Sequence, residues 1–416
     1  MDRSFYQENR QALYNQIDGD GLIVLFAGEA PRKTADAFYG FFANRNFAYL
    51  TGVGETCAQQ FVFMAAKRGA TVEETLFILP PDEYAERWNG RRMKADEARE
   101  KSGIEEIAWV DQFALRFHKA ANAGACQALW LDIDRLRSGE PDNEAQRFSR
   151  TAAAECPFLR VGNLLPHLRA LRTIKKPCEI EAMKTAMTVT REGILAMMRG
   201  SRPGMYEYEY KALFDAALTN RGVLAPAFPP IISAGANNFC IHYDAYTGRA
   251  QDGDMVLNDV GACWDYLCND VSRGWPCNSR FNERQRLLYT CAYQTSEYMF
   301  SIIKPGMPTA DVDLTARRYC FERLKDIGLL ASYEDVGRYM WHGGAHHVGF
   351  DVHDVVDMSR PVSAGMVFCV DIGIYCLEWG IGFRLEDNCL VTDDGCVNLS
   401  ASIPRSIDEI EAAMRG

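Results

Sequence analysis

Two pairs of acidic residues stand in apolar, strand-like runs in the second half of this 416-residue chain. In the first pair, Asp259 follows MVLN and Asp270 lies in YLCNDVS. A turn centred on Trp264 and Asp265 would place the two carboxylates directly opposite each other on antiparallel strands, where opposed Cβ atoms are about 4.5–5.5 Å apart. Like charges so close destabilise each other unless a cation lies between them, so this pair predicts a divalent-metal site.

The second acidic pair repeats the pattern. Asp371 follows VFCV and Glu386 follows GFRL, and a turn near Glu378 and Trp379 would bring them opposite each other. Any one of the four acids alone fits a strand-end group that faces solvent, but four together in apolar runs indicate a shared cavity. Two cations fit four carboxylates better than one, and a water shared by two metals becomes a hydroxide near neutral pH.

The histidines cluster in a way that supports a metal site. Four of the seven lie in HGGAHHVGFDVH, which spans residues 342–353. Imidazole binds metals and carries protons near neutral pH. His242, just before the first acidic pair, fits either the site or a hydrogen-bonded core histidine. One nitrogen with four carboxylates is a hard ligand set, which favours Mn²⁺, with Co²⁺, Fe²⁺ or Zn²⁺ as alternatives, over Cu(I) or thiolate-bound zinc.

The cysteines do not enter this expected ligand set. None of the 14 forms a C-x-x-C pair, and several lie in strand-like apolar runs, Cys369 among them. We interpret them as buried, reduced thiols of a cytoplasmic protein.

The elements that would position these residues predict an α/β (α+β) chain with two domains. Residues 1–168 alternate strand-like and helical segments, which is typical of a mixed sheet covered by helices. Helices are expected over about 4–17, 82–102 and 142–155, and strands over runs such as 21–28 and 46–52.

Residues 169–416 indicate two helices followed by strands, twice over. The expected segments are a helix from Lys176-Pro177, a helix over 206–219, strands over 231–275, helices over 283–304 and 310–327, and strands over 365–398. The segment 253–261, GDMVLNDVG, aligns with 365–373, GMVFCVDIG, with an Asp at the same place in both. This alignment favours an internal duplication of ααββ halves.

Composition excludes several classes of function. The net charge is −11 and the isoelectric point is near 5.3, which argues against a nucleic-acid partner. The first 16 residues are polar and contain no apolar core of a signal peptide. Apolar runs such as 21–28 are too short to span a membrane. A cytoplasmic protein without a membrane partner is therefore expected.

Several motifs resemble one known family, the pita-bread metallopeptidases, in their aminopeptidase P and prolidase (Xaa-Pro dipeptidase) branch. The motifs are NDVG at 258–261, NDVSR at 269–273, HGGAH at 342–346, DVHD at 351–354 and GFRLED at 382–387. In the first half, RNFAYLTG at 45–52 is similar to the N-terminal domain of aminopeptidase P proteins. The resemblance implies a creatinase/aminopeptidase-P-like mixed α/β domain followed by a pita-bread catalytic domain.

The resemblance also implies roles for single residues. The metal ligands would be Asp259, Asp270, His346, Asp371 and Glu386, with Asp270 and Glu386 bridging two divalent ions. His242 and His353 would bind substrate and stabilise the tetrahedral intermediate. His342 is similar to a supporting or substrate-side histidine, Arg384 would support the carboxylates, and Tyr375 would lie close to the site.

This chain departs from the family pattern at two places. The family usually has Glu, followed by Pro-Gly, where Asp371-Ile-Gly stands here, and the missing methylene shortens the reach of the ligand. A misplacement near 1 Å can cost about 10²-fold in rate. The family often has Thr at the positions of Ser272 and Gly274, so one hydroxyl is kept and one is lost.

The function that this resemblance implies is release of an N-terminal residue before proline, by attack of a metal-activated hydroxide. The partners would be peptides with proline at position two, and a homo-oligomer, dimer or larger, is implied. A dipeptide-only prolidase, a non-catalytic pita-bread binding protein and a creatinase-type amidinohydrolase are the alternatives. The presence of Asp371 in place of the usual Glu favours the non-catalytic binding protein. Retention of all five ligand-type positions argues against the amidinohydrolase.

Overall fold

The first unit of the chain, Met1–Leu171, is a mixed sheet with helices on both faces. The computed structural model describes residues 1–54, 60–124, 126–135 and 137–415. The sheet order is β4-β3-β2-β1-β5-β6, with strands β1 (Gly21–Phe26), β2 (Val62–Arg68), β3 (Thr71–Ile78), β4 (Glu106–Trp109), β5 (Ala128–Leu131) and β6 (Arg160–Asn163). β2 is antiparallel to both β1 and β3, whereas β1, β5 and β6 run parallel.

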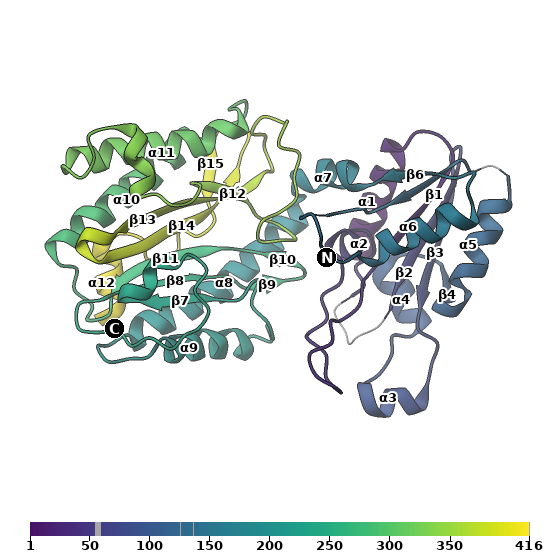
Figure 1. Ribbon diagram of the computed structural model, residues 1–416, viewed down its shortest axis with the longest axis horizontal. Helices are drawn as coiled ribbons and strands as arrows, with labels where there is room; N and C mark the ends of the chain where they lie inside the picture. The colour runs from purple at the N-terminus through teal and green to yellow at the C-terminus, as the bar shows by residue number, and fades with distance from the viewer. Residues whose placement is uncertain (55–59, 125, 136, 416) are drawn as a thin grey trace. The chain divides into compact units, whose positions relative to one another are not determined.

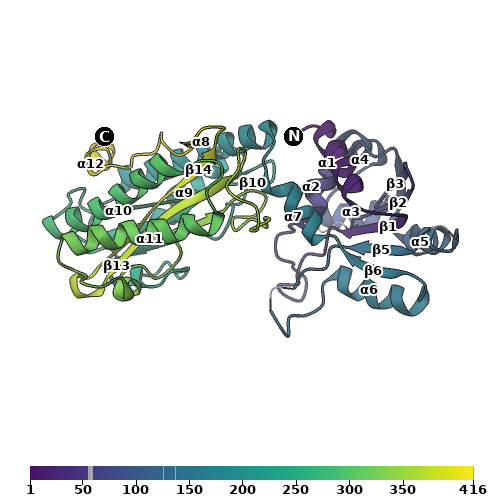
Figure 2. The ribbon, with the colours of Figure 1, turned by 90° about the horizontal axis from the view of Figure 1, so that it is seen from above.

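The helices of this unit are α1 (Arg3–Gln16), α2 (Arg45–Thr51), α3 (Glu83–Asn89), α4 (Ala95–Ser102), α5 (Phe113–Asn122) and α6 (Glu144–Glu155). One face of the sheet packs against α5 and α6 through a cluster that includes Phe26, Phe117 and Ala152. Figure 2 shows α1, α2 and α4 on the other side of the strands from α6. The predicted helix-covered sheet is confirmed.

The strand predicted over 46–52 is wrong, because this run forms the helix α2. The Asn44 side chain accepts hydrogen bonds from the backbone N–H groups of Asn46 and Phe47, at 2.9 and 3.0 Å, and so caps its first turn. Gly52 ends the helix with a left-handed φ of 68°. The run is buried throughout, and a short buried run has no periodicity that separates a strand from a helix.

The second unit, Arg172–Gly416, contains the predicted duplication. Its helices are α8 (Pro177–Gly200), α9 (Glu207–Asn220), α10 (Glu283–Ile302), α11 (Thr309–Asp326) and α12 (Ile407–Arg415). Its strands are β7 (Ile231–Ala234), β8 (Met255–Val260), β9 (Cys263–Trp264), β10 (Leu267–Cys268), β11 (Val271–Pro276), β12 (Ala345–His347), β13 (Val367–Cys376), β14 (Ile381–Val391) and β15 (Cys396–Asn398). The boundary predicted at residue 168 falls inside α7 (Leu165–Thr173), which joins the two units.

The two halves of this unit have the same order of elements. In each, two helices precede three antiparallel strands, arranged as β11-β8-β7 in one sheet and as β12-β13-β14 in the other, which β15 extends. In Figure 1, α8 and α9 lie below the strands and α10 and α11 lie above them. No helix among the described residues is long and apolar enough to cross a membrane.

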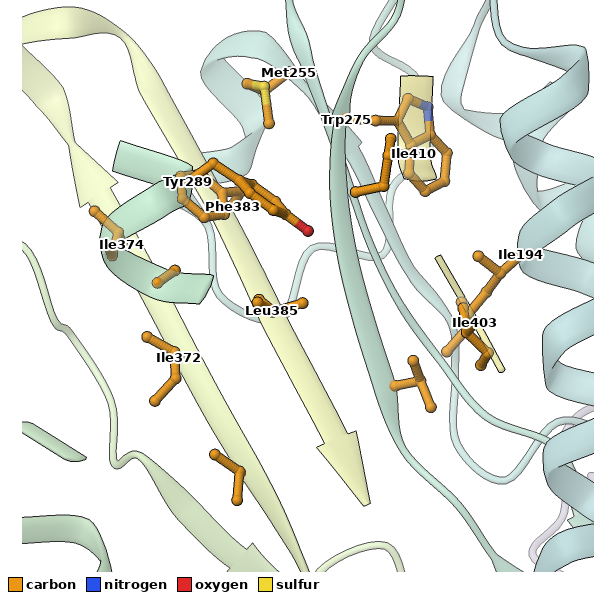
Figure 3. Close-up of a cluster of buried hydrophobic side chains, with 14 of the residues drawn as sticks. Ile194, Met255, Trp275, Tyr289, Ile372, Ile374, Phe383, Leu385, Ile403 and Ile410 are labelled. Atoms are coloured by element: carbon orange, nitrogen blue, oxygen red, sulfur yellow. The ribbon is translucent and has the colours of Figure 1, made fainter. Parts of the chain in front are cut away.

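The β13–β14 hairpin has two buried faces with different chemistry. Ile372 and Ile374 of β13 point into the hydrophobic core with Phe383 and Leu385 of β14 (Figure 3). Tyr289 of α10 stacks on Phe383 with ring centroids 5.2 Å apart. Because side chains alternate along a strand, the residues between these belong to the opposite face, where the acidic residues lie.

The register of this hairpin confirms one of the two predicted pairings. Asp371 pairs with Glu386, as expected from a turn near Glu378 and Trp379. The short helical turn Leu377–Trp379 makes the connection.

The pairing predicted for the first hairpin is wrong. The turn consists of Asp265 and Tyr266, with φ of 50° and 70°, and Asp259 pairs with Ser272. Asp270 lies two residues before Ser272 and so still belongs to the face of Asp259, because a shift of two residues keeps a side chain on its side of the sheet.

Gly261 allows the two strands of the first hairpin to approach closely. A Cβ at this position would lie 1.8 Å from the backbone oxygen of Asn269. The Asn269 side chain is itself fixed, because its Oδ1 accepts a hydrogen bond from Thr190 Oγ1 at 2.7 Å. The backbone that carries Asp270 therefore cannot move aside freely.

The substitution Gly261→Ala is expected to lower the stability of the second unit by about 3 kcal/mol, the upper range for forcing atoms into a packed site. Gly337→Ala is the control, because a Cβ there meets no atom within 4 Å. Chemical denaturation of both variants measures the difference. Equal midpoints for the two variants would contradict the close approach at Gly261.

Candidate metal centre

The inner face of the β13–β14 hairpin supplies much of the candidate site. Asp371 lies opposite Glu386, and Tyr375 and Arg384 follow on the same face. The Glu386 side chain is 2% exposed and the Asp371 side chain is 10% exposed. Both acids are therefore held away from bulk water. An unpaired charge is costly in such a buried place.

The other half of the unit supplies two further carboxylates to the same place. Asp259 Oδ2 accepts a hydrogen bond of 2.8 Å from Arg384 Nη2 of β14. The Asp270 carboxyl group contacts that of Asp259. Ser272 Oγ donates a 2.8 Å hydrogen bond to Glu386 Oε2, which links β11 to β14. The four acids predicted from two separate hairpins thus meet.

Buried oxygens in this cluster lack hydrogen-bond donors. Asp259 Oδ1, Asp270 Oδ1 and Asp371 Oδ1 are each buried without a hydrogen-bond partner. Buried carboxylate oxygens are normally satisfied by donors or by a metal. The donor set of this cluster therefore fits divalent cations.

The electrostatics of the acids lead to the same conclusion. Burial and the nearby charges of Asp259 and Glu386 raise the pKa of Asp270 well above its usual value. Burial and the charge of Asp371 likewise raise the pKa of Glu386. Burial opposes ionisation of Asp371 too, but the neighbouring His342 and Arg384 outweigh it and lower the pKa of Asp371. A cation would relieve the repulsion at Asp270 and Glu386.

His346 of β12 lies against the same acids. Its Nε2 is 3.1 Å from Glu386 Oε1 and 3.6 Å from Asp270 Oδ2. Burial would lower the pKa of His346, but the hydrogen bond and charge of Glu386 raise it to about 9. Without a metal, the His346 imidazolium thus supplies part of the positive charge that the acids need. His347, the next residue, belongs to the other face of the strand and packs on Phe368.

Two of the predicted substrate histidines lie nearer to solvent. His242 and His353 are both exposed, whereas the acids below them are buried. The ring of His353 contacts that of His346, with centroids 4.4 Å apart. Burial and the charges of His346 and His242 lower the pKa of His353, and the charges of Asp259 and Asp371 also act on His353, which therefore lies close to the acidic cluster.

A chain of hydrogen bonds surrounds Asp371 and Asp259. Arg384 Nη1 donates to Tyr375 Oη at 3.0 Å, and that oxygen lies 3.1 Å from His342 Nε2. His342 Nδ1 lies 3.1 Å from Asp371 Oδ2. The chain therefore runs from one acid to the other through Arg384, Tyr375 and His342.

The two departures from the family pattern at β11 have different outcomes. Ser272 uses its hydroxyl to hold Glu386. At Gly274 a Cβ would lie 2.6 Å from the Cβ of Phe383, so the close packing of β14 leaves no room for a side chain.

Sequence reasoning missed two residues of this centre, Cys369 and Asn388. Cys369 Sγ lies with ligand atoms of Asp270, His346 and Glu386, all within 4.8 Å of one another. Asn388 Nδ2 donates to Cys369 Sγ at 3.2 Å and to the backbone oxygen of Asp270 at 2.6 Å. The signal was present, because Cys369 precedes Asp371 by two residues and so shares its face.

Comparison with known families gives two matches along the chain. Residues 181–393 match "Metallopeptidase family M24", and residues 6–130 match "Aminopeptidase P, N-terminal domain". These matches fall in the second and the first unit, respectively.

Individual relatives are similar over the whole length. An Xaa-Pro aminopeptidase of Escherichia coli is 28% identical over 100% of this chain and 98% of its own. A structure from Bacillus anthracis, provisionally described as an aminopeptidase P, is 36% identical with a TM-score of 0.96, covering 100% of this chain and 99% of that one. E. coli aminopeptidase P with the inhibitor Pro-Leu is 27% identical with a TM-score of 0.90, covering 100% and 98%.

Replacing Asp270 by Asn is expected to stabilise the metal-free protein, because burial and the charges of Asp259 and Glu386 disfavour an ionised carboxylate there. The change removes one charge from a buried acidic cluster while keeping the shape of the side chain. The same variant should lose most of the stabilisation that Mn²⁺ gives the unsubstituted protein, which is about 4 kcal/mol at a thousandfold excess over Kd.

Thermal unfolding with a chelator and with Mn²⁺ measures both effects. Asp393→Asn, at an exposed turn, is the matched control and should behave as the unsubstituted protein. A metal-free Asp270→Asn protein that is less stable than the unsubstituted one would refute the repulsion.

Proposed function

The chain belongs to metallopeptidase family M24, and on that premise we propose that it is an Xaa-Pro aminopeptidase, which releases the N-terminal residue of peptides with proline at position two. The family resemblance seen in the sequence is confirmed, and so is the pita-bread fold of the second unit. The observation that carries the proposal is the convergence of four buried carboxylates and His346, with three carboxylate oxygens lacking donors.

The enzyme is a hydrolase that uses divalent metal ions, as its family does. The residues proposed to hold two of them are Asp259, Asp270, His346, Asp371 and Glu386, with Asp270 and Glu386 shared. The predominance of carboxylate oxygens favours Mn²⁺, with Co²⁺, Fe²⁺ and Zn²⁺ as alternatives. Bound there, such ions would polarise the scissile carbonyl and activate a water.

The exposed histidines are proposed to act on the substrate directly. His242 and His353 lie at the solvent side of the acids, where a peptide backbone would arrive. His353 keeps a lowered pKa, so it is neutral at pH 7 and can donate one ring N–H to the oxygen that becomes negative in the transition state.

Arg384, Tyr375 and His342 are proposed to orient the acids. Arg384 holds one oxygen of Asp259, and the other oxygen has no donor and is available to a metal. His342 does the same for Asp371. Tyr375 joins the two and keeps their distance fixed.

An apolar surface beside these residues suits proline. Trp341 stacks on Tyr375, with ring centroids 4.6 Å apart and planes inclined by 14°, and Phe239 lies 5.9 Å from Trp341. Ile241 and Tyr243 pack in the same cluster. A peptide bond to proline has no amide N–H, so selection must come from packing of the ring, and this surface offers it.

The first test is hydrolysis of a tripeptide Xaa-Pro-Yaa by the metal-free protein after addition of Mn²⁺. Release of free Xaa is expected only with metal, and an Xaa-Ala-Yaa peptide should be cleaved far more slowly. Glu386→Gln is expected to lose activity, because it removes a charge that the metals require. Metal binding without turnover would favour a binding protein instead, and cleavage of dipeptides alone would favour a prolidase.

The second test concerns the substrate histidines. His353→Ala is expected to reduce kcat by about 10²- to 10³-fold, the loss that follows removal of one donor to a developing oxyanion. The metal content should not change, because His353 is not a proposed ligand. His118→Ala, at a histidine of the first unit paired with Glu155, is the control. An unchanged kcat for His353→Ala would remove that residue from the mechanism.

A further inference from the structure

Cys369 occupies a central place on the inner face of the second hairpin. In the sheet register it lies directly opposite His346 of β12 on one side and Asn388 of β14 on the other. Glu386 is two residues from Asn388 and so is the diagonal neighbour of Cys369. A cation held by His346 and Glu386 must therefore lie beside the Cys369 side chain.

The ligand atoms confirm this placement. Cys369 Sγ and one ligand atom each of Asp270, His346 and Glu386 lie within 4.8 Å of one another. This spacing suits atoms that surround one ion, whose bonds to nitrogen, oxygen and sulfur are about 2.0–2.3 Å long.

Asp371 does not belong to this group of four. Its Oδ2 lies 3.1 Å from His342 Nδ1, so His342 holds the carboxylate on the side of Tyr375. The side chain of Asp is shorter than that of the Glu usual in the family. This limits how far the Asp371 carboxylate extends toward the group of four. The fourth ligand-type atom of the group is the sulfur of Cys369.

Two further contacts point to a ligand at this group of four. The Asp270 side chain is only 6% exposed, and its Oδ1 is buried without a hydrogen-bond donor. Asn388 Nδ2 donates both to Cys369 Sγ and to the backbone oxygen of Asp270, so one amide fixes the thiol and the acid together. Burial and the charges of Glu386 and Asp270 raise the pKa of the Cys369 thiol, so the sulfur keeps its proton until a cation binds.

We propose that Cys369 adds a sulfur ligand to the cation held by Asp270, His346 and Glu386. The proposal rests on the proposed function, because it assumes that divalent metals bind this centre. On binding, the thiol releases its proton to solvent and its sulfur forms a bond to the ion.

A sulfur ligand changes which metal this position prefers. Thiolate favours softer ions such as Zn²⁺ and Co²⁺ over Mn²⁺, which prefers oxygen. The position shared by Asp259 and Asp270 keeps oxygen ligands and suits Mn²⁺. The two positions of one centre therefore differ in selectivity.

Absorption spectroscopy of the Co²⁺-loaded protein tests the proposal without using activity. Addition of Co²⁺ to the metal-free full-length chain should produce an intense near-ultraviolet thiolate-to-cobalt band together with weak visible bands. Cys369→Ser should lose the near-ultraviolet band and keep the visible ones. Cys376→Ser is the matched control, because Cys376 is buried on the same strand but belongs to its other face and contacts Glu378.

Metal affinity gives a second readout. Competition with a chromophoric chelator should show that Cys369→Ser binds Zn²⁺ at least about 10-fold more weakly, the smallest loss usual for disturbing a metal's surroundings. Its affinity for Mn²⁺ should change less. Circular dichroism of the metal-free variants checks that both serine proteins are folded.

The outcomes separate this inference from the proposed function. Visible cobalt bands without a near-ultraviolet thiolate band, or equal Zn²⁺ affinity in Cys369→Ser and the unsubstituted protein, would overturn the sulfur ligand and leave the metallopeptidase intact. Failure of the chain to bind Co²⁺ at all would overturn both.

Discussion

Mutual repulsion among four buried carboxylates is the constraint that the rest of the second unit must meet. Acids that raise one another's pKa separate unless the backbone holds them, and here the backbone is two hairpins whose other faces lie in the hydrophobic core. Moving Glu386 would require moving Leu385, which is fully buried on the opposite side of the same strand. The core thus fixes a charge arrangement that is unfavourable by itself and favourable once cations neutralise it.

Buried ion pairs next to the site fix the strands in the same way. Arg273 of β11 donates to the backbone oxygen of Glu386 at 2.8 Å and pairs with Asp387 at 2.7 Å, with both side chains fully buried. Lys175 pairs with Asp354 at 2.9 Å and so anchors the segment that carries His353. These pairs lie one residue away from groups of the site. They therefore position the functional residues without adding charge to the acidic cluster.

The sequence predicted the residues of the site better than their geometry. The Asp371–Glu386 pairing followed from hairpin symmetry, because the turn length was judged correctly. The Asp259–Asp270 pairing failed by two residues, since positive φ at Asp265 and Tyr266 moves the turn, and neither residue type signals this. Asp259 and Asp270 nevertheless lie on the same face of the sheet, because side chains alternate with a period of two. Cys369 was set aside because a cysteine in an apolar run is usually only a core residue, and its neighbours across the sheet become known only with the register.

The internal repeat explains why the two metal positions need not be equivalent. Asp259 and Asp371 occupy corresponding places in the two halves, yet Arg384 holds the first and His342 holds the second. Arginine stays charged at any working pH, whereas histidine gains and loses a proton near neutrality. Asp259 therefore always shares its charge with a fixed cation, and Asp371 shares its charge with a group that can also exchange protons. The duplicated backbone therefore places two corresponding acids in different electrostatic surroundings, one beside a permanent cation and one beside a group that titrates.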